Sequence, residues 1–221
     1  METLKKHIDE SLFSNKPIDA GELSNKIELQ YLKDHIHIFS PGRVLNYDDR
    51  LIFTIDNGEL VLDSTTPNMK YRLEITGDLS RFPYKIKQIK FGPIDMFYFK
   101  DCTGLKNFKN IFSPKYRPCD VDEFEVRNCP SLESFEGWPD EQAVTSFYLD
   151  AAMKSYKGVP YVWMEISGQD GNWCINKDHH HSFGVEACLV DVDKMYNALP
   201  KCPVKNYLNR ELRAYYAKAK S

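Results

Sequence analysis

Residues 94–102, 121–129 and 144–152 are IDMFYFKDC, VDEFEVRNC and VTSFYLDAA, and apolar residues recur in all three at one spacing. In each stretch the first, fourth and sixth residues are apolar, and the ninth is Cys102, Cys129 or Ala152. Side chains two positions apart in a strand share a face, so the fourth and sixth residues point the same way. The three stretches therefore predict equivalent strands that bury equivalent residues.

The same spacing continues on both sides of these stretches. Counted from the first residue of each apolar pair, the marks fall at positions 73, 97, 124, 147 and 164, which are 17 to 27 residues apart. One turn of such a repeat cannot bury its apolar face alone, so neighbouring turns stack into a solenoid. The predicted inward pairs are Leu73/Ile75, Phe97/Phe99, Phe124/Val126, Phe147/Leu149 and Met164/Ile166.

Over residues 70–168 the chain resembles the leucine-rich-repeat superfamily, whose LxxLxLxxN/CxL pattern marks a strand and the turn after it. It departs from that pattern by using Phe and Val where Leu is usual and by its irregular repeat lengths. The resemblance implies an α/β repeat solenoid with short parallel strands. It also implies that Cys102 and Cys129 are buried thiols that satisfy backbone groups in the turn. Short, aromatic-rich versions of the pattern are similar to small bacteriophage-encoded proteins.

Four segments follow from the patterns, and we expect them to form one continuous domain. Residues 1–34 carry apolar residues every four positions, which predicts two short helices as an N-terminal helical cap. Residues 35–69 alternate in the manner of lead-in strands, at His35–Phe39 and Leu51–Ile55. Residues 70–168 hold the repeats, and residues 169–221 are expected to form a polar loop, a final strand and C-terminal helices.

Charge and composition exclude several classes of partner. A formal net charge of −3 and a pI near 6.1 provide no basic field for nucleic acid, so nucleic-acid binding is not expected. No window approaches the roughly 18 apolar residues of a membrane span, and the N-terminus lacks an apolar leader. We therefore expect a cytoplasmic protein whose six cysteines are reduced.

One segment suggests an enzyme as the alternative. Residues 167–184 are polar and rich in glycine, and contain three of the six histidines. Thiolate, imidazole and carboxylate are the usual ligands of zinc, so this loop could serve a metal- or thiol-dependent enzyme. Three consecutive histidines point in different directions, however, which favours a solvated loop with no metal, and no cofactor is expected. The candidate ligands are Cys174, Asp178, His179 and His181.

The residues between the inward pairs predict the function. They face outward and form a column of Glu74, Tyr98, Glu125, Tyr148 and Glu165 across the strands. Exposed tyrosines beside a tryptophan are typical interface anchors, so we predict a non-enzymatic protein-interaction module, an adaptor or an inhibitor, whose partner presents a basic surface. The alternative is that terminal segments cover the tyrosines. The candidate partner-binding residues are Glu74, Tyr98, Lys100, Glu125, Arg127, Tyr148, Trp163 and Glu165.

Overall fold

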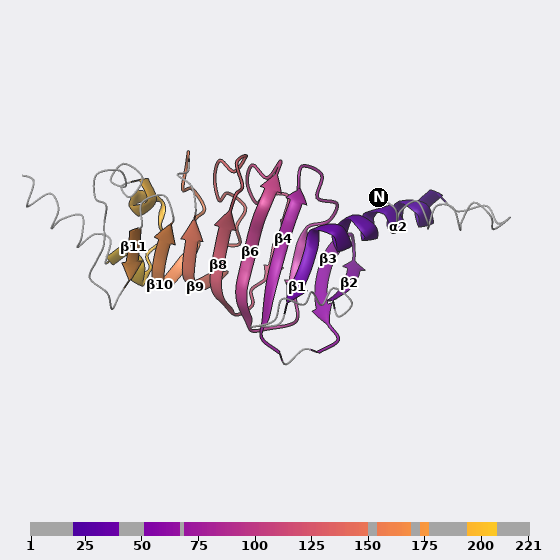
Figure 1. Ribbon diagram of the computed structural model, residues 1–221, viewed down its shortest axis with the longest axis horizontal. Coiled ribbons are helices and arrows are strands. Elements are labelled where there is room, and N and C mark those ends of the chain that lie inside the picture. Colours follow the sequence, from indigo (N-terminus) through magenta and orange to yellow (C-terminus); the bar gives the residue numbers. More distant parts are fainter. Residues whose placement is uncertain are drawn as a thin grey trace, which may run out of the picture. The chain divides into compact units, whose positions relative to one another are not determined.

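Two β-sheets carry most of the fold (Figure 1). The computed structural model describes residues 20–39, 51–66, 69–149, 154–168, 173–176 and 194–206, with backbone only at 20–25 and 173–176. The four-stranded sheet contains, in spatial order, β2 (Leu51–Asp56), β3 (Glu59–Ser64), β5 (Ile86–Ile89) and β7 (Phe112–Arg117). The seven-stranded sheet contains β1 (Ile36–Phe39), β4 (Tyr71–Asp78), β6 (Ile94–Thr103), β8 (Val121–Arg127), β9 (Ala143–Leu149), β10 (Tyr161–Gly168) and β11 (Trp173–Asn176).

The chain alternates between the two sheets from β3 to β8, so each turn adds one strand to each sheet. All neighbours from β4 to β10 in the larger sheet are parallel, whereas β1 and β11 pair antiparallel at its two edges. The architecture is a parallel β-solenoid of about four turns. The repeat solenoid and its short parallel strands were therefore predicted correctly from the sequence.

The α/β character implied by the leucine-rich-repeat resemblance is wrong. The described segments that return between strands of the larger sheet are strands and turns with no helix. The return from β4 to β6 shows why, because it contains Pro83 and Pro93, and proline lacks the N–H that a helix interior requires. Two of its apolar residues, Ile86 and Ile89, lie in β5 and are buried.

Helices are confined to the ends of the described chain. The helix α2 (Ala20–His35) matches the second helix predicted in residues 1–34, although Ile27 on its expected apolar face is 55% exposed. The chain divides into compact units at Asp34, and residues 35–221 form the unit that contains the sheets. Near the C-terminus residues 194–198 and 203–206 are helical, within the two helices expected there. The first predicted helix and the strand expected at 185–190 lie outside the described residues.

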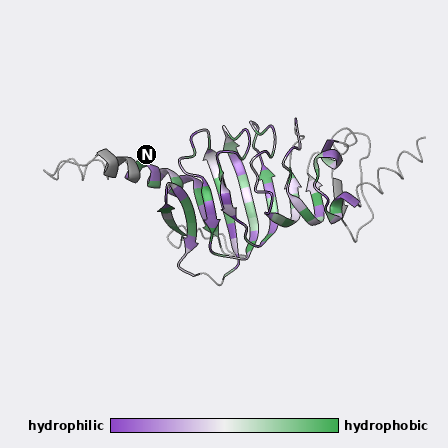
Figure 2. Cartoon of the chain, turned by 180° about the vertical axis from the view of Figure 1, so that it is seen from behind, coloured by the Kyte–Doolittle hydropathy of each residue, from purple (hydrophilic) through white to green (hydrophobic). Residues whose placement is uncertain are grey.

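The inward residues of the larger sheet stack in register. Phe97 lies opposite Leu73 and Phe124, and Phe147 lies opposite Phe124 and Ile166. A second buried column contains Ile75, Phe99, Val126 and Leu149. Figure 2 shows the resulting alternation of hydrophobic and hydrophilic residues along the strands. Four of the five predicted inward pairs are confirmed.

The fifth pair is half wrong. Ile166 is buried as expected, but Met164 is 41% exposed and Val162 is the buried residue at the start of β10. The register of β10 against β9 shifts between Val162 and Glu165. One more residue therefore separates the inward Val162 from Ile166 than separates the equivalent inward residues of the earlier strands. Such a bulge changes which side chains face the core.

An aromatic cluster fills the space between the sheets. The Trp138 ring lies 4.1 Å from the Phe124 ring and 5.3 Å from the Phe112 ring, measured between centroids. Phe124 also stacks on Phe147 with centroids 5.4 Å apart. Aromatic pairs at these separations add to the stabilisation from buried area. Trp138 therefore links Phe124 of the larger sheet with Phe112 of the smaller sheet.

The residues that follow the inward pairs of β6 and β8 repeat as well. Asp101 and Asn128 both adopt positive φ, 53° and 48°, a conformation that Asn and Asp tolerate better than most residues. The next residue in each case is a cysteine. Cys102 Sγ donates a hydrogen bond to the Ile75 carbonyl at 3.3 Å, and Cys129 Sγ donates to the Phe99 carbonyl at 3.4 Å. The expected role of the two thiols is confirmed, although Cys129 is only half-buried.

The Gln142 side chain forms hydrogen bonds with the segment that follows β7. No strand pairs with β7 on its far side within the described residues. The buried Gln142 amide instead accepts from the Cys119 N–H at 3.0 Å and donates to the Cys119 carbonyl at 2.9 Å. It also accepts from the Tyr116 hydroxyl at 3.2 Å. The Gln142 amide thus holds the connection between β7 and β8 by its hydrogen bonds with the backbone of Cys119.

Phe124→Ala tests the core. Phe124 is fully buried among aromatic rings, so its loss should destabilise the protein by about 3–5 kcal/mol. Denaturant unfolding measures this change, with Lys100→Ala as an exposed control that should stay within about 0.5 kcal/mol of wild type. An unchanged unfolding midpoint in Phe124→Ala would contradict the inward stacking.

Gln142→Leu tests the hold of Gln142 on the connection between β7 and β8. Leucine leaves the part-buried N–H and C=O of Cys119 without the partners described above, so we expect a loss of at least about 2 kcal/mol. Thermal unfolding should show Gln142→Glu in between, because glutamate keeps the acceptor oxygen and loses the donor. Equal stability of all three proteins would show that these bonds are dispensable.

Candidate functional site

The outward column predicted from the sequence exists on the larger sheet. Glu74 lies opposite Tyr98, Tyr98 opposite Glu125, and Glu125 opposite Tyr148. The fifth position is different, because the bulge in β10 places Ser167 opposite Tyr148. Glu165 instead lies opposite Ser146, one step along the strand.

The expected exposure of this column is wrong at its centre. Tyr98 is 7% exposed and Glu125 is 1% exposed, while Glu74 and Tyr148 are half-buried. Arginine side chains cover the rings of Tyr98 and Tyr148. The Arg72 guanidinium lies 5.1 Å from the centre of the Tyr98 ring, and the Arg127 guanidinium lies 4.5 Å from that of Tyr148. Stacked guanidinium groups remove these rings from solvent and attract them electrostatically.

An ion pair and a thioether complete the arrangement. Arg127 Nε donates to the Glu125 carboxylate in a short ion pair, which balances the buried charge. The Tyr98 hydroxyl donates to Met96 Sδ at 3.0 Å, and Arg72 Nη2 donates to the same sulfur at 3.2 Å. The outer-face cluster, as we call it, consists of Arg72, Met96, Tyr98, Glu123, Glu125, Arg127 and Tyr148.

Sequence reasoning omitted Met96 from the outward residues. Met96 lies opposite Arg72 and Glu123, at the outward place next to Tyr98. The sequence contained a signal for this position. Ile94 and Phe97 are both buried, and Met96 is one of the two residues between them. Methionine resembles a core residue, so its apolar character concealed its position.

Two groups of the outer-face cluster have strongly shifted acidity. Burial, and then the nearby Glu125 carboxylate, raise the pKa of Tyr98 to about 12. Burial, the Glu125 charge and a hydrogen bond with Glu125 raise the pKa of Glu123 to about 7. A hydrogen bond between two carboxyl groups needs one proton, and the raised pKa places it on Glu123. At neutral pH Glu123 is thus partly protonated, and the pair carries less than two full negative charges beside Arg127.

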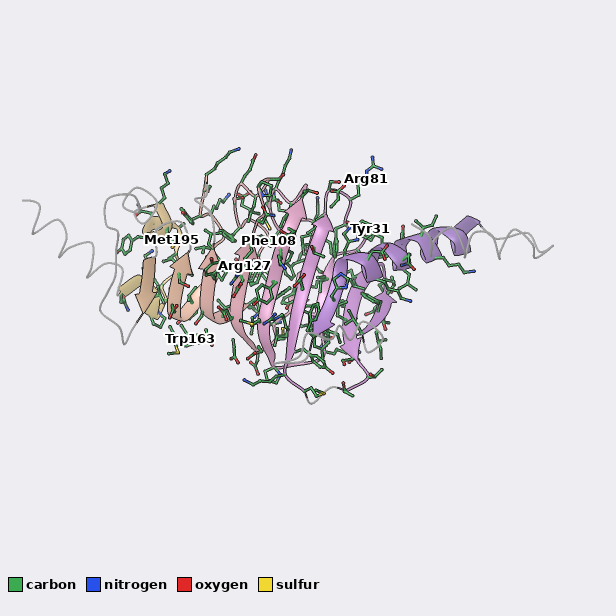
Figure 3. The ribbon with its side chains drawn as sticks, viewed as in Figure 1. Tyr31, Arg81, Phe108, Arg127, Trp163 and Met195 are labelled. Carbon is green, nitrogen blue, oxygen red and sulfur yellow. The ribbon has the colours of Figure 1, made fainter. Side chains whose placement is uncertain are left out.

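The exposed apolar part of the outer face lies at the start of β10. Trp163 is 52% exposed and Met164 is 41% exposed, and both lie in the bulge between Val162 and Glu165. The Tyr161 ring meets the Trp163 ring edge to face at 5.0 Å between centroids. Figure 3 shows Trp163 at the end where β10 begins and Arg127 further along the sheet. We call Tyr161, Trp163 and Met164 the β10 apolar patch.

Acidic groups line the same end of the sheet. Asp95 and Asp122 lie near the start of β6 and β8, and Trp163 lies near the start of β10, so in the parallel sheet all three lie at one end. The side chains of Asp95 and Asp122 are 40% and 50% exposed and share Lys70 as their cation. Glu123 and the half-buried Glu165 lie on either side of Ser146.

The predicted partner-binding residues thus separate into three groups. Lys100, Arg127 and Trp163 are exposed, whereas Glu74, Tyr148 and Glu165 are half-buried. Tyr98 and Glu125 are buried and can reach a partner only through the arginines above them. The candidate surface therefore shifts from the tyrosine column toward the β10 apolar patch.

The loop considered for metal chemistry is only partly described. Residues 173–176 form β11, which pairs antiparallel with β10, so this part of the expected loop is a strand. The side chain of Cys174 and the residues Asp178, His179 and His181 lie outside the described part of the chain. Within the described part, no three His, Cys, Asp or Glu side chains group as metal ligands.

No family model matches the chain, and no curated protein or solved structure is significantly similar to it. None of the helices in the described residues is long and apolar enough to cross a membrane. Function is therefore inferred from the residues of this chain alone.

Glu123 should make stability depend on pH. Its pKa is about 7 in the folded protein and about 4.5 when unfolded, so the folded state holds the extra proton between these values. Stability should therefore fall as pH rises from about 4.5 to about 7 and level off above that range. Chemical unfolding at several pH values should show this fall reduced in Glu123→Gln and retained in the exposed control Glu133→Gln. The same fall in both variants would contradict the carboxyl pair.

Proposed function

We propose that the chain is a protein-binding module, an adaptor or an inhibitor, whose partner contacts the β10 apolar patch and the acidic end of the outer face. The observation that carries this proposal is the half-exposed Trp163, which projects from the bulge where the parallel pairing of β10 with β9 shifts. Tryptophan combines a large apolar area with an N–H donor, and it is among the residues most enriched at interface centres.

The surroundings of Trp163 favour a partner of a particular kind. Tyr161 and Met164 extend its apolar area, and Met adapts readily to a partner's shape. The carboxylates of Asp95, Asp122 and Glu165 form an acidic surround, in which Lys70 forms ion pairs with Asp95 and Asp122. A partner that presents lysine or arginine around an apolar pocket fits this surface best.

The outer-face cluster supports the proposal indirectly. Its stacked arginines and ion pair hold the side chains of β4, β6, β8 and β9 in one arrangement. A surface that is ordered before binding loses less conformational entropy when a partner binds. Kinship with leucine-rich-repeat proteins remains part of this proposal, supported by the shared spacing of inward residues and by the matching thiol bonds of Cys102 and Cys129.

Trp163→Ala tests the proposal. Affinity capture from the native lysate identifies candidate partners, and titration of the purified partner then measures the dissociation constant. We expect Trp163→Ala to weaken binding at least about 30-fold, a loss near 2 kcal/mol, while the melting temperature stays close to wild type.

The exposed Lys109→Ala, on a return segment, is the matched control and should bind normally. Added salt should slow association with wild type if the acidic surround attracts the partner. Unchanged affinity of Trp163→Ala for every captured partner would exclude the β10 apolar patch as the interface.

A further inference from the structure

The outermost strand of the smaller sheet offers a second surface, independent of the proposed function. β2 pairs with β3 on one side, and no strand pairs with its other side within the described residues. Edge strands usually carry lysine, proline or a bulge that prevents further pairing. β2 is Leu-Ile-Phe-Thr-Ile-Asp, has none of these features and pairs with β3 without a register shift.

The backbone of β2 presents its unused groups in a regular row. Asn57 and Gly58 both have positive φ and form a two-residue turn, so the flanking Asp56 and Glu59 are a hydrogen-bonded pair. Hydrogen-bonded pairs alternate along antiparallel strands, which leaves Leu51, Phe53 and Ile55 at the intervening positions. The N–H and C=O groups of these three residues therefore point away from β3.

Contacts on the far side of β3 agree with this assignment. Leu60 donates its N–H to the Lys85 carbonyl at 2.8 Å, and the Leu62 carbonyl accepts from Lys90 N at 2.8 Å. Leu60 and Leu62 lie opposite Ile55 and Phe53. The Leu60 N–H and the Leu62 carbonyl therefore point away from β2. Ile55 and Phe53, which lie opposite these leucines, do not form hydrogen bonds with these two groups.

The side chains of β2 leave apolar surface exposed on both faces. Ile52 is 42% exposed and Ile55 is 44% exposed, on opposite sides of the strand, and Thr54 is exposed as well. Phe53 is half-buried between them. Exposed β-branched residues on an unprotected edge are the usual features of a strand that pairs with another strand.

We propose that β2 pairs antiparallel with β2 of a second copy of this chain. A two-fold axis perpendicular to the sheet at Phe53 brings Phe53 opposite its own copy and Leu51 opposite Ile55 of the partner. This register joins only residues whose backbone groups point outward, and it forms about six hydrogen bonds, two for each such pair. It also covers Ile55 with Leu51, and Ile52 with Thr54, so the strand is complementary to itself.

Ile55→Pro and Ile55→Lys test the pairing. Proline at this position removes an outward N–H and no bond to β3, so the hairpin should remain intact. Sedimentation velocity over roughly 5 to 500 μM should show wild type in monomer–dimer exchange, with the dissociation constant raised at least about 10-fold in both variants.

Trp163→Lys is the matched control, since it makes the same apolar-to-lysine change on the β10 apolar patch and should leave the dimer unchanged. Circular dichroism and the melting temperature verify that each variant is folded. A wild-type protein that is monomeric over the whole range, or a dimer that both Ile55 variants retain, would overturn the proposal.

Single cysteines test the register. Hydrogen-bonded antiparallel partners have Cα atoms about 5.5 Å apart, within the range of a disulfide, so Phe53→Cys should cross-link to its own copy on mild oxidation. In the same register Ile55 and its copy lie about 13 Å apart along the strands, so Ile55→Cys should not cross-link. Wild type controls for the native thiols. Equal cross-linking of the two variants, or none in Phe53→Cys, would overturn this pairing.

Discussion

The stacking of inward side chains between successive turns is the constraint on which the rest of the fold depends. Parallel pairing sets β4, β6, β8 and β9 side by side in one register, which places Phe124 directly between Phe97 and Phe147. Each ring is buried by the turns before and after it, and Trp138 adds a contact from the return segment. No single turn would be stable alone, because its apolar face would remain in water.

The same register gathers polar groups on the opposite face, where burial has to be compensated. Glu125 is almost inaccessible to water, and an isolated carboxylate there would be strongly destabilising. Arg127 neutralises it, and Glu123 retains a proton that lowers the repulsion between the two carboxyl groups. Such a network stabilises one arrangement of side chains more than it stabilises the fold, which suits a surface that has to present a fixed shape.

The two sheets end in different ways. Within the described residues β7 is an edge of the smaller sheet, and the Gln142 side chain holds the segment after it by hydrogen bonds with the backbone of Cys119. The larger sheet has short antiparallel strands, β1 and β11, at its edges. β2 has the free backbone row and exposed isoleucines described above, so among the described edges it departs most from the usual protection.

The sequence by itself determined the strands β4, β6, β8 and β9, their inward residues and the equivalent positions of Cys102 and Cys129. These features depend on spacing along the chain, and strand alternation makes that spacing visible. Only the tertiary structure decided that the return segments are strands, that β10 has a bulge exposing Met164, and that Tyr98 and Glu125 are buried. Each of these depends on residues from other turns: β5 needs β3 and β7 as neighbours, the bulge is defined against β9, and Tyr98 is covered by Arg72 of the preceding strand. A side chain on a predicted outward face is exposed only if no neighbouring strand supplies a group that covers it, and a linear pattern does not contain that information.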